Sequence, residues 1–248
     1  MKDIQKMEER FLEAITRCKK SKDVSGSIGT LGEKTLHSTL KYYYEPNMEN
    51  HEIKIGPYVA DICNEKGIVE IQTRNFSAMR KKLEYLLKTY PVTIVYPVSY
   101  TKWLYWIDET TGMISKKRKS PKQGTPLCIF YELYRIKHLL NHPNLSLDII
   151  LLNMEEYRLL NGWSEDRKRG SERYELIPIA LKEQMSINSI EDYKKLIPKG
   201  LPDTYSSKDF KKASGLSLHH SQTALNILTY LGVVKRIGKR GNSYLYQN

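Results

Sequence analysis

The sequence predicts an α/β protein in which helices flank a mixed β-sheet, with a small second domain at the C-terminal end. Residues 51–98 alternate short segments rich in Val and Ile with a segment of helical period, in the order strand, strand, strand, helix, strand. The last 48 residues instead hold two short helical segments and a hairpin pattern. A hydrophobic content of 40% and a charged content of 27% are typical of a globular protein.

Two helices are expected before the first strand. Residues 3–21 place Ile4, Met7, Phe11, Ile15 and Cys18 at helical spacing. A second helix is predicted from Thr30 to Tyr44, because Thr30 and Glu33 form a capping box. Glu33, His37 and Lys41 then share one helical face. They face one site on a functional interpretation, whereas on a structural one Glu33 only caps the helix and His37 fills a partly buried slot.

Residues 58–74 are predicted to form a β-hairpin that follows a strand at 51–56. Asn64, Glu65, Lys66 and Gly67 supply the turn. A register symmetric about the turn places Asp61 opposite Glu70, with Ala60, Ile62, Val69 and Ile71 on the core face. Opposed acids repel unless a cation lies between them, which favours a divalent metal. The alternative is a solvated face on which both acids point to water.

The chain after the hairpin extends the sheet. Asn75 is expected to cap a helix with Phe76, Met79, Leu83, Leu86 and Leu87 inward, and residues 91–98 to form a strand parallel to the one before it. Further expectations are a hairpin around residues 108–112, a helix over 126–142 and a strand over 147–153. Residues 1–154 would then form one domain, 155–200 a connector with a short helical start, and 201–248 the second domain.

The net charge of +12 makes a polyanion the leading partner, and nucleic acid the first choice. Five cations within seven residues, which include Arg118 and Lys119, form either a phosphate contact or a solvated loop. We expect a cytoplasmic protein without a membrane partner, because no apolar run approaches the roughly 20 residues of a membrane span and the first residues are too charged for a signal peptide. The three cysteines lack zinc or disulfide spacing.

The order of these elements, with Asp61 and Glu70-Ile71-Gln72, resembles the core of the PD-(D/E)XK nuclease superfamily, especially its E-x-Q variant in competence-associated nuclease-like proteins. The resemblance spans residues 30–98 and implies a restriction-endonuclease-like sheet. It also implies that Asp61, Glu70 and the carbonyl of Ile71 hold Mg²⁺ or Mn²⁺, with Glu33 assisting.

The chain departs from the commonest family pattern at Gln72, where that pattern has Lys. A neutral amide positions water but brings no positive charge. Arg74, Lys81 and Lys41 are the candidate replacement cations, and His37 is a further supporting residue.

The last 48 residues resemble a winged helix-turn-helix domain, with seven Lys or Arg against two acids. On that resemblance, base edges would be read from one helix face by His219, His220, Gln222, Thr223 and Asn226. Phosphates would be contacted from the wing by Lys235, Arg236, Lys239 and Arg240. The alternative is a winged helix used for protein contacts.

The sequence and the family resemblance therefore predict a Mg²⁺-dependent deoxyribonuclease of the endonuclease type that binds double-stranded DNA and is compatible with a homodimer. Two other hypotheses stay open: a DNA-binding regulator whose nuclease fold has lost its chemistry, and an RNA-processing or RNA-binding factor.

Overall fold

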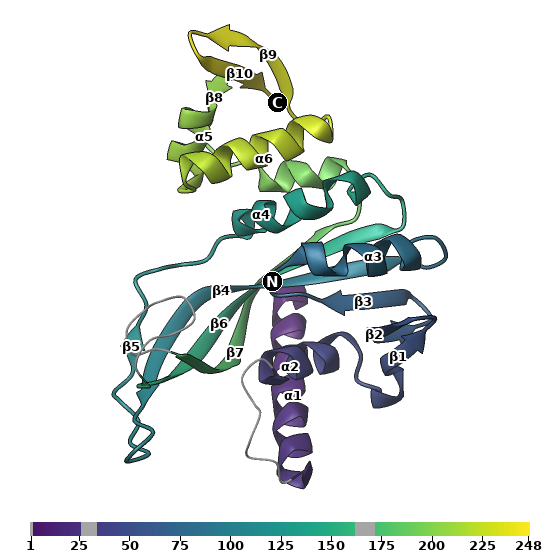
Figure 1. Ribbon diagram of the computed structural model, residues 1–248, viewed down its shortest axis with the longest axis vertical. Helices are drawn as coiled ribbons and strands as arrows, with labels where there is room; N and C mark the ends of the chain where they lie inside the picture. Colours follow the sequence, from purple (N-terminus) through teal and green to yellow (C-terminus); the bar gives the residue numbers. More distant parts are fainter. Residues whose placement is uncertain (1, 26–33, 162–171) are drawn as a thin grey trace. The chain divides into compact units, whose positions relative to one another are not determined.

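The computed structural model describes residues 2–25, 34–161 and 172–248, and Figure 1 labels their helices and strands. The first part of the chain holds α1 (Lys2–Ser25), α2 (Lys34–Tyr44), η1 (Met48–Asn50), β1 (His51–Ile55), β2 (Tyr58–Asn64), β3 (Gly67–Ile71) and α3 (Phe76–Leu86). The middle holds β4 (Val92–Ile107), β5 (Arg118–Lys119), η2 (Pro126–Ile129), α4 (Phe130–Leu133), η3 (Tyr134–Leu139) and β6 (Leu145–Leu159). The last part holds β7 (Glu172–Ile187), η4 (Glu191–Leu196), β8 (Tyr205–Ser206), α5 (Ser207–Ser214), α6 (Leu218–Tyr230), β9 (Lys235–Arg240) and β10 (Ser243–Gln247).

The predicted α/β class is confirmed by a large mixed sheet with helices. Its strand order is β1-β2-β3-β4-β6-β7, and β5 pairs with β4. β1 and β2 are antiparallel, whereas β3 and β4 are parallel, as expected for two strands joined through a helix. A second sheet has the order β8-β10-β9.

The described chain divides into two compact units. Unit 1 comprises residues 1–64, 97–125 and 150–184, and unit 2 comprises residues 65–96, 126–149 and 185–248. In unit 1, α1 packs on α2 through an edge-to-face contact between the rings of Phe11 and Tyr43, 5.4 Å apart, with Arg10 over the Tyr43 ring. The inner face of α1 is formed by Phe11, Ala14 and Cys18, whereas Ile4, expected on that face, is 55% exposed.

Unit 2 contains the parallel β3–β4 pair and α3. The predicted inner positions of α3 are confirmed, since Phe76, Met79, Leu83 and Leu86 are all buried. The prediction that the Asn75 side chain caps α3 is wrong, because Asn75 has left-handed backbone angles and makes no capping bond. The Phe76 N–H donates instead to the Glu132 carboxylate of α4, at 2.9 Å, so an acid 56 residues away caps this helix.

The turn between β2 and β3 lies where the sequence predicts it, at Glu65 and Lys66. Ala60, Ile62 and Ile71 are buried as expected, and Val69 is half-buried. β3 is nevertheless buried at Ile68 and Glu70 as well, so it is a largely internal strand and not a half-solvated one.

Three elements differ from the sequence prediction in length or type. β4 continues without a break from Val92 to Ile107, and the acidic turn after it leads back to the short strand β5. The helix expected over 126–142 is three short pieces, η2, α4 and η3, with a kink at Ile136. Residues 155–159 belong to β6 and not to a helix, and the expected connector contains the 16-residue strand β7.

The C-terminal elements follow the predicted order of two helices and a hairpin. Ser206 and Asp209 form a capping box for α5, Gly215 ends that helix in the left-handed conformation, and Ser217 caps α6. α6 buries Leu225 and Leu228, as its periodicity predicts, and packs against α4 (Figure 1).

Gly67, at the start of β3, is a position where a side chain cannot be accommodated. Its φ is +120°, and a Cβ atom there would lie 2.4 Å from the carbonyl oxygen of Pro91. Gly200 also has a positive φ, +80°, but a Cβ there meets nothing within 4 Å. A comparison of substitutions at the two glycines therefore separates the cost of a positive φ from the cost of a steric clash.

We expect Gly67→Ala to lower the free energy of unfolding by about 1 to 3 kcal/mol more than Gly200→Ala does, because only Gly67→Ala adds a clash to the strain of a positive φ. Urea titration of both variants followed by circular dichroism measures the difference. Equal losses in the two variants would contradict the close approach of β3 to Pro91.

Candidate active site

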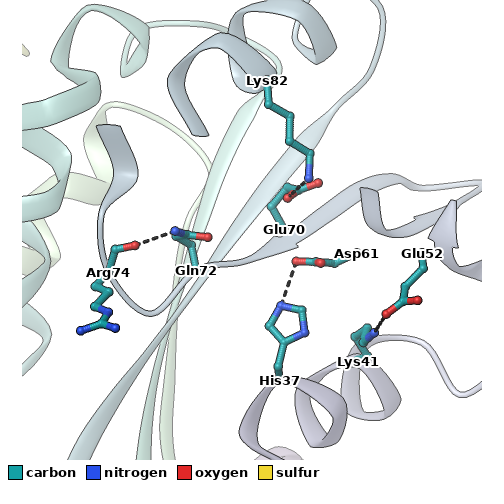
Figure 2. A network of polar contacts seen from close by, with 8 residues as sticks. All are labelled: His37, Lys41, Glu52, Asp61, Glu70, Gln72, Arg74 and Lys82. Carbon is teal, nitrogen blue, oxygen red and sulfur yellow. Dashed lines mark hydrogen bonds and ion pairs between the residues drawn. The ribbon is translucent and has the colours of Figure 1, made fainter. Parts of the chain in front are cut away.

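Glu70 is a buried acid with a lysine partner. Its side chain is 6% exposed, and its carboxylate lies 2.5 Å from the ammonium group of Lys82 on α3, within unit 2 (Figure 2). The alternative in which Glu70 points to water is therefore wrong. A buried carboxylate needs a cation or several donors to remain charged, and the chain places Lys82 there.

Lys82 is the residue that the sequence did not single out. The predicted supporting cation from this helix, Lys81, is exposed. Lys82 follows Arg80 and Lys81, and the sequence predicts that all three lie on a solvated face of the helix. Lys82 nevertheless immediately precedes the buried Leu83 and is itself half-buried. Its position at the border of the apolar face is the only signal in the sequence that could have distinguished it.

Asp61 pairs with a histidine in unit 1. The Nε2 atom of His37 on α2 lies 3.2 Å from the Asp61 carboxylate, and the two side chains are 30% and 21% exposed (Figure 2). The structure therefore brings together two residues that the sequence named as candidates from separate elements. A histidine beside a carboxylate can hold or release a proton near that acid.

Lys41, one helical turn after His37, has a different partner. Its ammonium group lies 2.8 Å from the Glu52 carboxylate of β1 (Figure 2). The hydrogen bond and the charge of Lys41 hold the pKa of Glu52 below its ordinary value. Glu52 also has a φ of 54°, an uncommon conformation for a residue other than glycine. Glu33, the first member of this predicted helical face, lies outside the described residues.

Gln72 lies just beyond the end of β3. Its backbone N–H donates to the carbonyl of Val95 at 2.9 Å and so continues the pairing of β3 with β4. Its side-chain amide donates to the carbonyl of Arg74 at 2.5 Å (Figure 2). The amide thus stabilises the turn into α3, and the Arg74 residue is exposed. Ile71, whose carbonyl is the predicted further ligand, is buried.

A second buried acid was not anticipated. Glu156 in β6 is fully buried, and three cations surround its carboxylate: Lys102 at 2.5 Å, Arg158, and Arg173 at 3.8 Å. Burial alone would raise the pKa of Glu156, but these cations hold it below its ordinary value. All four residues lie in unit 1. The sequence shows only Arg158 close to Glu156, because Lys102 and Arg173 come from the distant parts of the chain that form β4 and β7.

The predicted reading face of α6 has partners within unit 2. The side-chain oxygen of Asn226 accepts a hydrogen bond of 2.8 Å from Lys137, whose ammonium group also lies over the Tyr230 ring. His220 makes an edge contact with Tyr131, and the Thr223 hydroxyl donates to the carbonyl of His219. Gln222 and His219 remain exposed.

The basic hairpin residues are available to a partner. Every residue of β9 is exposed, including Lys235, Arg236, Lys239 and Arg240. Arg236 and Lys239 lie over the Tyr244 ring, at 4.3 and 4.7 Å from its centroid. Arg118 and Lys119, in β5, are exposed as well.

The donor chemistry of Asp61 and Glu70 fits a hard divalent cation. Within the described ranges there is no group of three or more His, Cys, Asp or Glu side chains placed to share an ion. Mg²⁺ does not need one, since it binds through one or two carboxylates and completes its shell with water and phosphate oxygens. Each carboxylate carries a basic neighbour, so an ion at Glu70 would bind beside or in place of Lys82, and an ion at Asp61 beside or in place of His37.

The fold and these pairs define an α/β protein with charged pairs on or beside the strands of a mixed sheet. The chain belongs to the family with the domain of unknown function DUF8091, whose model matches residues 34–188. It is also 30% identical over 229 residues to a protein of Treponema pallidum (strain Nichols) described as an uncharacterized protein, with 89% of this chain and 87% of the relative covered. No solved structure gives a significant match. None of the helices in the described residues is long and apolar enough to cross a membrane.

We expect Lys82→Met to lower the free energy of unfolding by about 3 kcal/mol, because the buried Glu70 carboxylate loses its cation. Lys81→Met, a change at the exposed neighbour, serves as the matched control and should be nearly neutral. The added change Glu70→Gln should restore part of the loss, since the uncompensated charge disappears. Urea titration of the three variants forms this test, and an equal loss in Lys81→Met and Lys82→Met would contradict it.

Proposed function

We propose that the protein is a metal-dependent nuclease acting on DNA. The observation that carries the proposal is the buried Glu70–Lys82 pair, an acid and a cation held together between a parallel strand and the helix that follows it. A carboxylate that is kept charged can hold a divalent cation, and a lysine beside it brings the positive charge that Gln72 lacks. The order of α2, β1, β2, β3, α3 and β4 also supports the resemblance to the PD-(D/E)XK core.

In this proposal Asp61 and Glu70 are ligands of Mg²⁺ or Mn²⁺, a role that the family resemblance assigns to them. The carbonyl of Ile71 is a further ligand, by the family resemblance. When bound, the ion supplies Lewis acidity and lowers the pKa of a coordinated water.

The residues of the chain have separate tasks beside the ion. Lys82 stabilises negative charge on the phosphate, while His37 receives or supplies a proton next to Asp61. Glu33 assists by the family resemblance, and Gln72 positions the attacking water after releasing the Arg74 carbonyl.

DNA binding is assigned to the exposed cations of β9, with Arg118 and Lys119 as further phosphate contacts. We take the hairpin of β9 and β10 as the wing that the resemblance to a winged helix-turn-helix domain implies, because its four exposed cations suit phosphates. Asn226 reads bases only after leaving Lys137, so its contribution to specificity is smaller than that of the exposed Gln222.

A specific observation favours a second function, that of a DNA-binding regulator without catalysis. Both candidate metal ligands already have a basic partner, and the Gln72 amide is bonded to the chain itself. Such pairing stabilises the fold without any metal. The two functions differ in one property, because only the nuclease cleaves DNA.

We expect Mg²⁺- or Mn²⁺-dependent nicking of supercoiled plasmid by the wild-type chain, and a loss of at least about 100-fold in Glu70→Gln, because a catalytic ion is no longer held. Glu65→Gln, which neutralises the exposed acid of the adjacent turn, is the matched control and should keep its activity. No nicking by a folded wild-type protein that still binds DNA would favour the regulator.

The same preparations separate cleavage from binding. Glu70→Gln should bind duplex DNA nearly as wild type does, while joint replacement of Lys239 and Arg240 by Ala should weaken binding to all duplexes and flatten its salt dependence by up to about 2 in log–log slope. Parallel losses of cleavage and binding in Glu70→Gln would contradict this division of tasks.

A further inference from the structure

The outer part of β4 carries aromatic side chains at a half-exposed surface. From Val92 to Val98 the strand is mostly buried, but from Ser99 to Ile107 every residue is half-exposed. This stretch contains Trp103 and Tyr105, which are large side chains that proteins normally bury. Aromatic rings left together on an open sheet face mark a binding surface more often than a core.

Two tyrosines on this surface are stacked and held in place. The rings of Tyr105 and Tyr157 lie 4.7 Å apart with an angle of 7° between their planes. Both hydroxyl groups donate to the carboxylate of Glu155, at 3.1 and 3.3 Å. Burial and the charge of Glu155 raise the pKa of Tyr157, so its hydroxyl remains a donor. The rings are thus ordered before any ligand arrives, which lowers the entropic cost of binding.

Positive charge lies on the same surface. The ammonium group of Lys117 is 4.7 Å from the centre of the Trp103 ring and 2.9 Å from the Glu155 carboxylate. Lys119 in β5 pairs directly opposite Trp103, so these two side chains share a face of the sheet. We call the surface formed by Trp103, Tyr105, Tyr157, Lys117 and Lys119 the aromatic face.

A cavity adjoins the aromatic face. It measures about 290 Å³, close to the lower end of ligand-sized sites, and is lined by Tyr100, Thr101, Lys119, Ser120, Pro121, Lys122 and Gln123. Two of its lining residues are lysines and one is a tyrosine. A negatively charged group that carries a flat ring fits this combination of charge and aromatic surface.

We propose that the aromatic face binds an unpaired nucleic-acid strand, with bases stacked on Trp103 and the tyrosines and phosphates against Lys119 and Lys122. Bases in a duplex are stacked on each other and cannot reach such rings, whereas those of a single strand can. The surface lies wholly in unit 1. This inference goes beyond the proposed function, because binding of an unpaired strand requires neither metal nor cleavage.

Fluorescence anisotropy in EDTA tests the inference on the full chain, with a labelled oligothymidylate and a duplex of the same length. Tyr105→Leu and Trp103→Leu should each weaken binding of the single strand at least about fivefold and that of the duplex by less than about twofold. Trp106→Leu changes a half-exposed aromatic residue on the opposite side of the same strand and is the matched control. Tyr105→Phe keeps the stacked ring and loses only its hydrogen bond to Glu155, so it should bind within about twofold of wild type.

An oligomer that has the same phosphates but lacks bases decides between stacking and charge. Wild type should bind it at least about fivefold more weakly than oligothymidylate, and Tyr105→Leu should abolish that difference. Equal wild-type affinity for both oligomers would overturn the inference, because charge alone would then explain binding. Tighter, Tyr105-dependent binding of polyglutamate would overturn it in favour of an acidic protein partner. Thermal unfolding of each variant checks that it is folded. If Tyr105→Leu does not fold, Trp103→Leu provides the test of stacking instead.

Discussion

The ion pair between Glu70 and Lys82 is the constraint on which the parallel part of unit 2 depends. β3 is buried at Ile68, Glu70 and Ile71, so an acid in its middle requires a cation from the adjacent helix. α3 can supply that cation only if its inward positions Met79 and Leu83 pack as they do. A polar pair and an apolar face therefore fix the same helix on the same strand.

Two other buried acids in the described residues also have donor groups as partners. Glu132 is buried in α4 and accepts the first N–H of α3, while Glu156 is buried among Lys102, Arg158 and Arg173. Each of these acids has at least one partner distant in sequence. Removal of a partner would leave a buried charge without full compensation in a low dielectric. Basic residues in this chain thus fall into two groups, because some stabilise buried acids while others, as in β9, are exposed.

The sequence predicted the parts of the fold that are encoded locally. The turn at Glu65 and Lys66, the parallel strands around α3 and the caps at Ser206 and Ser217 follow from turn chemistry, helical period and capping preferences. The outer parts of β4 and β6 were not predicted in full, because charged and aromatic residues are mixed there and give no apolar period. β7 was not predicted because its sequence mixes basic, acidic and apolar residues, a composition that we assigned to a connector.

The sequence singled out two acids of the candidate site but not the cation beside Glu70. Asp61 and Glu70 were named because a symmetric hairpin register would oppose them, whereas Lys82 stands in a basic run on a helix and differs from Lys81 by its packing. The partners of Asn226 and His220 could not be predicted from the sequence either, because Lys137 and Tyr131 belong to a segment that is distant along the chain.

The central claim is that Glu70, the buried acid beside Lys82, is a ligand of a divalent cation. Calorimetric titration of Mn²⁺ into the wild-type chain and into Glu70→Gln tests it directly, without reference to any substrate. We expect saturable binding in the wild type that is lost in Glu70→Gln. A wild type without saturable binding, or an unchanged affinity in Glu70→Gln, would contradict it.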